Sequence, residues 1–416
     1  MLDDTLLDDP AALQRADHDR ALLALAGAGA RVRTALRQAE SAGLDRLRPD
    51  GRPRAVLVAG HGSALTAAEM LSALAGTGSL VTALPPTEAA APRADRAGAR
   101  PAFTAGLGWQ LPGWAGPLDL LVISSADGGE QGLVSLAEQA YARGCAIVVT
   151  APAGSALAEA ALQVRALPLP FTASVLSEDL APVPAAEPDL PAEDPAALWS
   201  HLTPMLALAQ KIGLTQLPYD ALPAVADLLD AAAVRCRPDA AAYTNPAKGL
   251  AARLAGTVPL LWAEGPIAGA AAARFAAQLA DRAGRPALAG PLPQVLTAHR
   301  GMFTGQLGAG ADPDDFFRDR VEEPDPLHLQ VLLLRHVPGA AGPVAEEGRD
   351  GPVEVPEEDA GPRSFGVTRA HRLAAAHDVR LTEYASTRPD ALHALADLVA
   401  LTDFAAVYLG LAAAQS

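Results

Sequence analysis

The segment Gly60-His61-Gly62-Ser63 has residue types suited to holding a phosphate group. It lies between an apolar run and an Ala-rich stretch, which predicts a turn between a parallel strand and a helix. Backbone N–H groups and the helix dipole favour an anion at such a turn, and a serine hydroxyl adds a donor. There is neither a G-x-G-x-x-G pattern nor a P-loop lysine, so nucleotides are not expected. The alternative is that the glycines serve only close packing of strand against helix.

A second loop of the same kind follows the apolar run LDLLVI and reads Ser124-Ser125-Ala126-Asp127-Gly128-Gly129-Glu130. In open α/β sheets, ligands bind at the carboxyl ends of the strands, near the switch in strand order. Two such loops in one half of the chain favour phosphate binding over simple packing. The predicted phosphate contacts are Gly60, Gly62, Ser63, Ser124, Ser125, Gly128 and Gly129.

Short apolar runs alternate with helical patterns along the whole chain, which predicts βαβ units and parallel sheets. In the first half we expect strands at 55–59, 79–84, 118–123, 146–150 and, more weakly, 162–167. In the second half we expect strands at 258–262, 285–288, 328–334, 365–369 and 379–382, and a closing helix at 391–411. The fold class is therefore α/β, with two doubly wound parallel sheets of five strands each.

The division into domains follows from composition. Residues 178–195 are acidic and rich in proline, as is typical of a linker. We expect a helical segment at 1–40, a first domain at 41–177, and a second domain at 196–416 with a mobile acidic loop at 339–363. The stretches from Arg54 and from Thr257 share one layout, in which Gly60 and Gly265 fall at equivalent places. Duplication of one domain explains this repeat, and chance similarity of two βα units is the competing interpretation.

Composition excludes several functions. The 416 residues carry a net charge of −16 with a pI near 4.9, which disfavours nucleic-acid binding. Cys145 and Cys236 show no metal-ligand spacing, the histidines form no metal motif, and no cofactor is indicated. We see no cationic leader and no run of about 20 uninterrupted apolar residues, so a cytoplasmic protein without membrane contact is expected.

Three stretches resemble sugar isomerase (SIS) domains. GHGSALTAAEML is similar to the first loop of such domains, and VISSADGGEQGLVSLAEQAYARGCAIVVTA to the second. NPAKGLAARLAGTVPLLWAEGPIAGAAAARFAAQLADRAGRPAL, from Asn245, resembles the bifunctional phosphoglucose/phosphomannose isomerase family, with two SIS domains in one chain. The resemblance covers about residues 40 to 411. It implies tandem SIS domains that bind a sugar phosphate, and interconversion of aldose and ketose 6-phosphates through an enediol.

The resemblance also implies catalytic residues. Asp281 stands where the family has the glutamate that moves the proton between C1 and C2. His299 is the candidate for the histidine that opens the sugar ring, two residues beyond the family's spacing. As alternatives, Asp281 is a solvated residue that pairs with Arg282 or Arg285, and His299 is a loop histidine without a role.

Other family features are altered. The second loop of the family reads S-Y-S-G-N-T, whereas this chain has Ala126, Gly128 and Gly129 there, and the family's functional lysine and arginine have no counterpart. Two hypotheses remain: a working isomerase of the glucose-6-phosphate/mannose-6-phosphate type, and a SIS protein that binds a phosphosugar as a sensor or regulatory subunit. A purely structural dimer is a third, weaker option. Because the family's active site is completed by a second subunit, the resemblance implies a homodimer.

Overall fold

The computed structural model describes residues 4–47, 51–89, 103–173, 193–304, 327–339, 351–354 and 363–413. The chain is divided into two compact units. Residues 27–227 form the first unit, and residues 1–26 with 228–416 form the second unit. Of the expected linker, only 193–195 falls within the described residues. Most of the expected acidic loop at 339–363 lies outside them.

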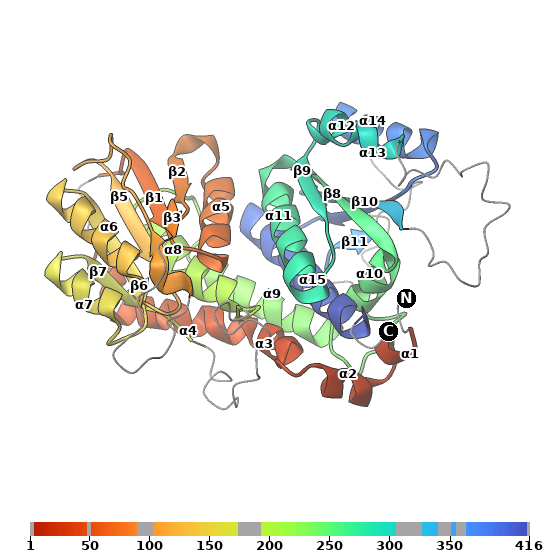
Figure 1. Cartoon of the computed structure of the whole chain (residues 1–416), viewed down its shortest axis with the longest axis horizontal. Helices are drawn as coiled ribbons and strands as arrows, with labels where there is room; N and C mark the ends of the chain where they lie inside the picture. The colour runs from red at the N-terminus through yellow and green to blue at the C-terminus, as the bar shows by residue number, and fades with distance from the viewer. Residues whose placement is uncertain are drawn as a thin grey trace. The chain divides into compact units, whose positions relative to one another are not determined.

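The sheet of the unit 27–227 is fully parallel, with the strand order β2-β1-β5-β6-β7 (Figure 1). Its strands are β1 (Ala55–Ala59), β2 (Leu80–Leu84), β5 (Leu120–Ser124), β6 (Ala146–Ala151) and β7 (Leu167–Pro170). Every residue of β1 and β5 is buried, which is the burial that a central parallel strand requires and the reason for its continuous apolar run. The expected strand at 162–167 begins later, because Ser155 caps a helix that includes Leu162. A small ribbon pairs β3 (Glu88–Ala89) with β4 (Leu107–Gly108).

Helices cover both faces of this sheet. They are α4 (Ala28–Ser41), α5 (Ser63–Ala75), α6 (Gln131–Ala142), α7 (Ala156–Gln163) and α8 (Ala197–Lys211). Helices α6 and α7 pack on one face, whereas α4, α5 and α8 pack together on the other. Helix α8 belongs to the first unit, and its residues 197 to 209 are all buried. The sequence placed residues from 196 onward in the second domain, and the structure differs because α8 packs against α4 and α5.

The sheet of the second unit has four parallel strands in the order β12-β10-β8-β9. They are β8 (Thr257–Glu264), β9 (Leu288–Pro291), β10 (His328–His336) and β12 (Arg380–Ser386). The fifth strand, β11 (Val353–Glu354), is antiparallel to β12 and has two residues.

The prediction of five parallel strands in this unit is therefore wrong. Residues 365–369 begin the helix α14 (Phe365–Ala376) instead. Ser364 caps this helix by accepting a hydrogen bond from the backbone of Val367 at 3.3 Å. Val367, Ala370 and Ala374 are buried, which is a helical spacing that a strand would not show.

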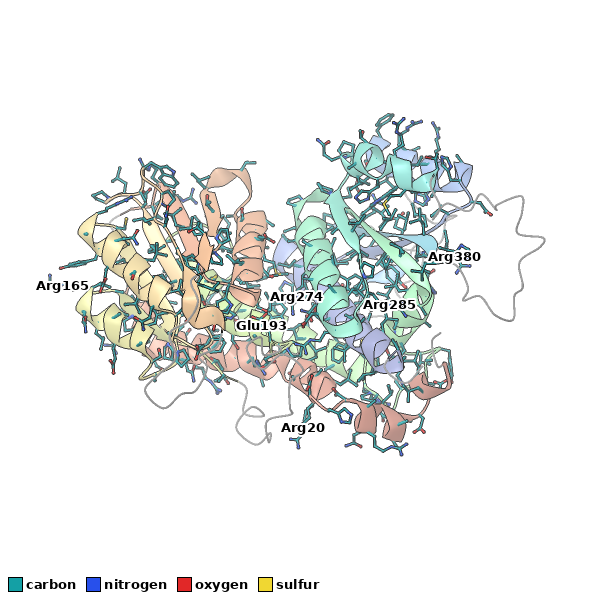
Figure 2. All side chains as sticks on the ribbon, in the orientation of Figure 1. Arg20, Arg165, Glu193, Arg274, Arg285 and Arg380 are labelled. Atoms are coloured by element: carbon teal, nitrogen blue, oxygen red, sulfur yellow. The ribbon has the colours of Figure 1, made fainter. Side chains whose placement is uncertain are left out.

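The remaining helices pack on this sheet or on the helices that cover it. They are α1 (Asp4–Leu7), α2 (Pro10–Ala16), α3 (Ala21–Ala26), α9 (Ala221–Arg235), α10 (Pro246–Leu254), α11 (Gly265–Ala283), α12 (Val295–Ala298), α13 (Arg300–Phe303) and α15 (Ala391–Ala413). One face carries α12, α13 and α14, and the other carries α10, α11 and α15. A buried pair joins α11 to α15, where Arg274, labelled in Figure 2, donates to Asp403 at 2.8 to 3.0 Å.

Helix α15 is long and apolar enough to cross a membrane, with a mean hydropathy of 1.7. However, 89% of its most apolar window is buried within the protein. This burial is typical of a core helix.

The first 40 residues do not form a segment of their own. Helices α1 to α3 contact α15 in the second unit, whereas α4 belongs to the first. Within the second unit, the side chain of Lys248 joins α1 to the segment before α10. Its buried ammonium donates to the carbonyls of Leu7, Pro238 and Ala240 at 2.6, 2.7 and 2.8 Å.

Candidate functional site

The polar residues of the first unit gather where the strand order reverses. From β1 the chain passes to β2 on one side, and β5 then pairs with β1 on the other. The loops that follow β1 and β5 therefore meet at the carboxyl edge of the sheet. This switch point is where open α/β sheets bind their ligands.

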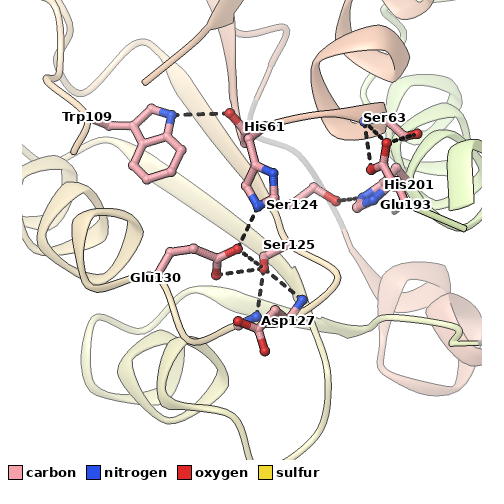
Figure 3. A network of polar contacts seen from close by, with 11 residues as sticks. His61, Ser63, Trp109, Ser124, Ser125, Asp127, Glu130, Glu193 and His201 are labelled. Carbon is pink, nitrogen blue, oxygen red and sulfur yellow. Dashed lines mark hydrogen bonds and ion pairs between the residues drawn. The ribbon is translucent and has the colours of Figure 1, made fainter. Parts of the chain in front are cut away.

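The N-terminus of α5 holds a carboxylate in this structure (Figure 3). The backbone N–H of Ser63 donates to Glu193 Oε1 and Oε2 at 2.9 and 3.0 Å, and the Ser63 hydroxyl donates to Oε2 at 2.8 Å. Gly62, at φ +54°, precedes the helix, and a Cβ there would lie 2.7 Å from the Glu193 carboxylate. The glycine therefore makes the space that the anion occupies. Of the predicted cradle, Gly62 and Ser63 lie against this carboxylate.

Gly60 has a different role. A Cβ at this position would lie 2.7 Å from the Ser124 carbonyl oxygen, so the glycine allows the two loops to approach closely. The carbonyl of Gly60 accepts a hydrogen bond from Trp109 Nε1 at 3.3 Å. Gly60 thus lies at the close approach of the two loops, and its contact with phosphate stays a prediction.

The second loop is organised around its own side chains. The Ser125 hydroxyl donates to Glu130 at 2.8 Å and accepts from the backbone of Asp127 and Gly128 at 3.1 and 2.7 Å. Gly128, at φ +73°, leaves no room for a Cβ beside Ser155. A Cβ on Gly129 would instead meet Asp127 at 3.0 Å. Ser125, Gly128 and Gly129 shape the turn, and the Ser125 hydroxyl is occupied by the Glu130 carboxylate.

His61 and Glu130 form an ion pair between the two loops. Their atoms Nε2 and Oε1 lie 2.9 Å apart, with Glu130 fully buried and the His61 side chain 28% exposed. Burial would lower the pKa of His61, but the hydrogen bond to Glu130 and the nearby carboxylates raise it above its ordinary value. Burial would raise the pKa of Glu130, but hydrogen bonds from His61 and Ser125 hold it below its ordinary value. The pair is therefore charged over a wide pH range.

Ser124 is withdrawn from the loop surface. It ends β5, is fully buried, and its hydroxyl lies 2.7 Å from Nδ1 of His201 on α8. Burial and the charge of His61 lower the pKa of His201 to about 3, so its ring is neutral. Ser124 thus fixes α8 to the sheet and does not face the anion site.

The assembled site offers an anion cradle beside a carboxylate-held imidazole. The former suits a phosphate group, and the latter suits proton transfer. Among the described residues, no group of three or more His, Cys, Asp or Glu side chains is placed to hold a metal ion.

The two predicted catalytic residues lie in the other unit and are far apart within one chain. Asp281 is near the end of α11, which runs from the carboxyl end of β8 toward the amino end of β9. His299 follows β9 at the carboxyl edge, between α12 and α13. The 19 residues of α11 make this helix about 28 Å long, so Asp281, near its end, lies far from the carboxyl edge where His299 is found.

The surroundings of each residue are also distinct. The carboxylate of Asp281 lies 3.0 Å from Arg282 Nε, and its side chain is 46% exposed. Nδ1 of His299 accepts a hydrogen bond from Trp262 Nε1 at 3.0 Å, and burial lowers the pKa of this histidine.

The second sheet has its own switch point, between β8 and β10. Arg335 lies there and reaches Glu264 at 2.6 Å and Glu383 at 2.5 Å. His371 approaches the same Glu383 at 3.2 Å. Arg363 also approaches Glu383, at 3.8 Å, so the arginines at this edge are paired with carboxylates of the same unit.

Two hollows in the second unit measure about 700 and 660 Å³. The larger is lined by Arg253, Glu354 and Tyr384, and the smaller lies at the amino ends of β8, β10 and β12. Neither contains the loops after β1 and β5. The titratable side chains and the predicted loop residues meet in the polar network of the first unit.

Four residues of this network were not predicted: His61, Glu130, Glu193 and His201. His61 and Glu130 lie inside the two loops that the sequence singled out, so their titratable side chains were the available signal. Glu193 is 130 positions from Ser63 in a proline-rich segment, and His201 is in a helix assigned to the other domain. Sequence spacing gives no signal for these two.

Residues 243–337 match the family of bacterial phospho-glucose isomerase C-terminal SIS domains. This stretch lies in the second unit, from just before α10 to the end of β10. None of the curated proteins matches the chain.

Several solved structures share the fold over nearly the whole chain. A hypothetical protein from Thermus thermophilus has a TM-score of 0.57 at 13% identity, over 98% of this chain and 89% of its own. A candidate phosphosugar isomerase from Clostridium difficile has 0.54 at 10% identity, over 94% and 91%. The C-terminal domain of glucosamine-fructose-6-phosphate aminotransferase from Francisella tularensis has 0.52 at 8% identity, over 95% and 96%. At these identities the likeness shows the fold, and two helix-flanked parallel sheets of five and four strands are consistent with tandem SIS domains.

Proposed function

We propose that this chain is a tandem SIS protein of the glucose-6-phosphate/mannose-6-phosphate isomerase type that binds a sugar phosphate in the unit 27–227. The phosphate is placed at the N-terminus of α5, where it replaces the Glu193 carboxylate. One observation carries the proposal: the chain's own carboxylate already takes three hydrogen bonds from Ser63 at this point. A phosphate group is likewise anionic, and its oxygens accept the same hydrogen bonds.

Binding is supported more strongly than turnover. Of the predicted contacts, only Gly62 and Ser63 face the anion, so the phosphate is held mainly by the first loop. A sensor or regulatory subunit needs no more than this.

Aldose–ketose isomerisation is the second candidate, favoured by the family match over 243–337. In this reaction Asp281 removes the proton from the carbon next to the carbonyl, and an enediol forms. Because Asp281 and His299 lie at opposite edges of one sheet, both could act on one substrate only if a second copy of the chain supplied one of them. The isomerase therefore requires the homodimer, which stays a prediction, as does the cytoplasmic location.

Calorimetric titration tests binding, with glucose 6-phosphate, fructose 6-phosphate and mannose 6-phosphate against free glucose. We expect the phosphates alone to bind, and Ser63→Ala to weaken them at least about tenfold because a charge-assisted hydrogen bond is lost. Ser364→Ala is the matched control, since it removes a helix-capping hydroxyl in the other unit. Equal affinity for glucose and its phosphate would contradict the proposal.

A coupled assay with fructose 6-phosphate and mannose 6-phosphate separates the two candidates. Turnover that is abolished in Asp281→Ala establishes the isomerase. Binding without turnover supports the non-catalytic binder. Light scattering that shows only monomer at micromolar concentration would count against the homodimer.

A further inference from the structure

We propose that His61, held in place by Glu130, is a catalytic acid–base residue that donates a proton to the ring oxygen of the bound sugar phosphate. This inference rests on the proposed function, since it needs a sugar phosphate at the N-terminus of α5. It assigns ring opening to the first unit and leaves His299 without that role.

The hydrogen bond between Nε2 of His61 and Glu130 fixes the orientation of the imidazole. Glu130, which is fully buried, takes a hydrogen bond from His61 Nε2, and the single proton of the Ser125 hydroxyl is shared between its two oxygens. The Ser125 hydroxyl is in turn held by two backbone N–H groups of its own loop. A base or acid whose partner is itself held by a second layer of hydrogen bonds has the arrangement that proton transfer requires.

The other face of the ring is available to a ligand. No described residue forms a hydrogen bond with His61 Nδ1, and the side chain is 28% exposed. In Figure 3 the ring lies between the Glu130 network and the Ser63–Glu193 contact. The chain thus leaves one nitrogen for a group next to the anion.

Chemistry decides which group that is. In a hexose 6-phosphate the ring oxygen is bonded to C5, and C5 reaches the phosphate through only C6 and O6. The ring oxygen is therefore near the phosphate, whereas C1 and C2 are farther from it. Since His61 is two positions from Ser63, its proton is placed for the ring oxygen.

The step balances as follows. The Nδ1 proton of the imidazolium moves to the ring oxygen while the C1–O5 bond breaks. The C1 hydroxyl loses its proton to water, and its oxygen becomes the aldehyde oxygen. Water returns a proton to His61. Closure on the opposite face of C1 by the reverse steps gives the other anomer, so the measurable reaction is anomerisation.

The charged groups around His61 set its pH range. Glu130 from the start of α6, Asp127 from the loop after β5, and Glu193 from the segment before α8 favour the imidazolium, and the neutral His201 on α8 adds no charge. The acid form therefore persists above the ordinary pKa of histidine, and the rate falls once pH exceeds the raised value. Glu130→Gln removes the nearest carboxylate and should move this fall to lower pH.

The experiment measures anomerisation of glucose 6-phosphate by selective-inversion NMR, with calorimetric binding in parallel on the full chain. We expect catalysis above buffer, and a loss of about 100-fold or more in His61→Ala. Added imidazole should restore part of the rate in that variant, which a merely structural role would not allow. His328→Gln, an exposed residue of the other unit, is the control and should keep the full rate.

The outcomes are distinguishable. Binding of glucose 6-phosphate without anomerisation above buffer overturns the role of His61 and leaves the proposed function intact. An unchanged rate in His61→Ala overturns it as well. If no sugar phosphate binds, the proposed function fails first.

Discussion

Glu193→Gln tests whether the chain's own carboxylate competes with ligand for the N-terminus of α5. The substitution keeps the size of the side chain and removes its charge. Glu193 takes three hydrogen bonds from Ser63, at 2.8 to 3.0 Å. A ligand phosphate must displace all three before it can bind.

The magnitude follows from these contacts. A hydrogen bond to a charged group contributes about 1.5–3 kcal/mol, and ordering one backbone residue costs about 1–2 kcal/mol. The ordering cost offsets part of the hydrogen-bond energy. The contact between Glu193 and Ser63 is therefore favoured over the separated side chains by a net free energy on the order of 1–2 kcal/mol. Its loss should tighten phosphate binding by about five- to thirtyfold.

The assay is calorimetric titration of inorganic phosphate and of glucose 6-phosphate. Glu138→Gln, on the exposed side of α6, removes the same charge and should leave both affinities within about twofold. An affinity that is unchanged or weaker in Glu193→Gln would refute the reasoning, because no displacement would then be needed.

Three further predictions concern neighbouring features. The pKa of His201 is lowered from 6.5 to about 3, so between these pH values the unfolded chain binds one more proton than the folded chain. The free energy of unfolding should therefore fall by about 1.4 kcal/mol per pH unit as the pH drops below 6.5. His201→Gln should flatten this slope in denaturant titrations. Gly62→Ala and Gly76→Ala both place a side chain at positive φ and should each destabilise the protein by about 1 kcal/mol. Only Gly62→Ala crowds the anion, so only this variant should weaken phosphate binding, about tenfold or more by calorimetry. Lys248→Met leaves three carbonyls without their donor and should lower the free energy of unfolding by about 3 kcal/mol, whereas the exposed Lys211→Met should change it by less than about 0.5 kcal/mol in the same denaturant series.

Periodicity predicts the buried strands well. The run at 55–59 is β1 to the residue, because a strand buried on both faces must be apolar throughout. The segment 365–369 was misread as a strand because it is short. Its helical spacing is visible only when Ala370 and Ala374 are included.

The site is predictable only where it is local. Gly62 and Ser63 could be found because a glycine turn before a helix forms an anion site from adjacent residues. Glu193 and His201 reach the site through tertiary packing of a segment more than 60 residues away, and no pattern in the sequence encodes that distance. Ser124 has the sequence context of a loop hydroxyl, but it is buried and contacts His201 in the core.

The contact of Lys248 with α1 has a consequence for synthesis on the ribosome. Leu13, Leu22 and Leu25 in α2 and α3 are buried in the unit that also contains 228–416. These leucines emerge before their partners, which are translated only after residues 27–227, about 10–40 s later at about 5–20 residues per second. The unit 27–227 can fold during this time, while the leucines are still exposed to solvent. The two segments of the other unit therefore complete their folding together, and release of a chain that stops before residue 248 would leave the first helices without a partner.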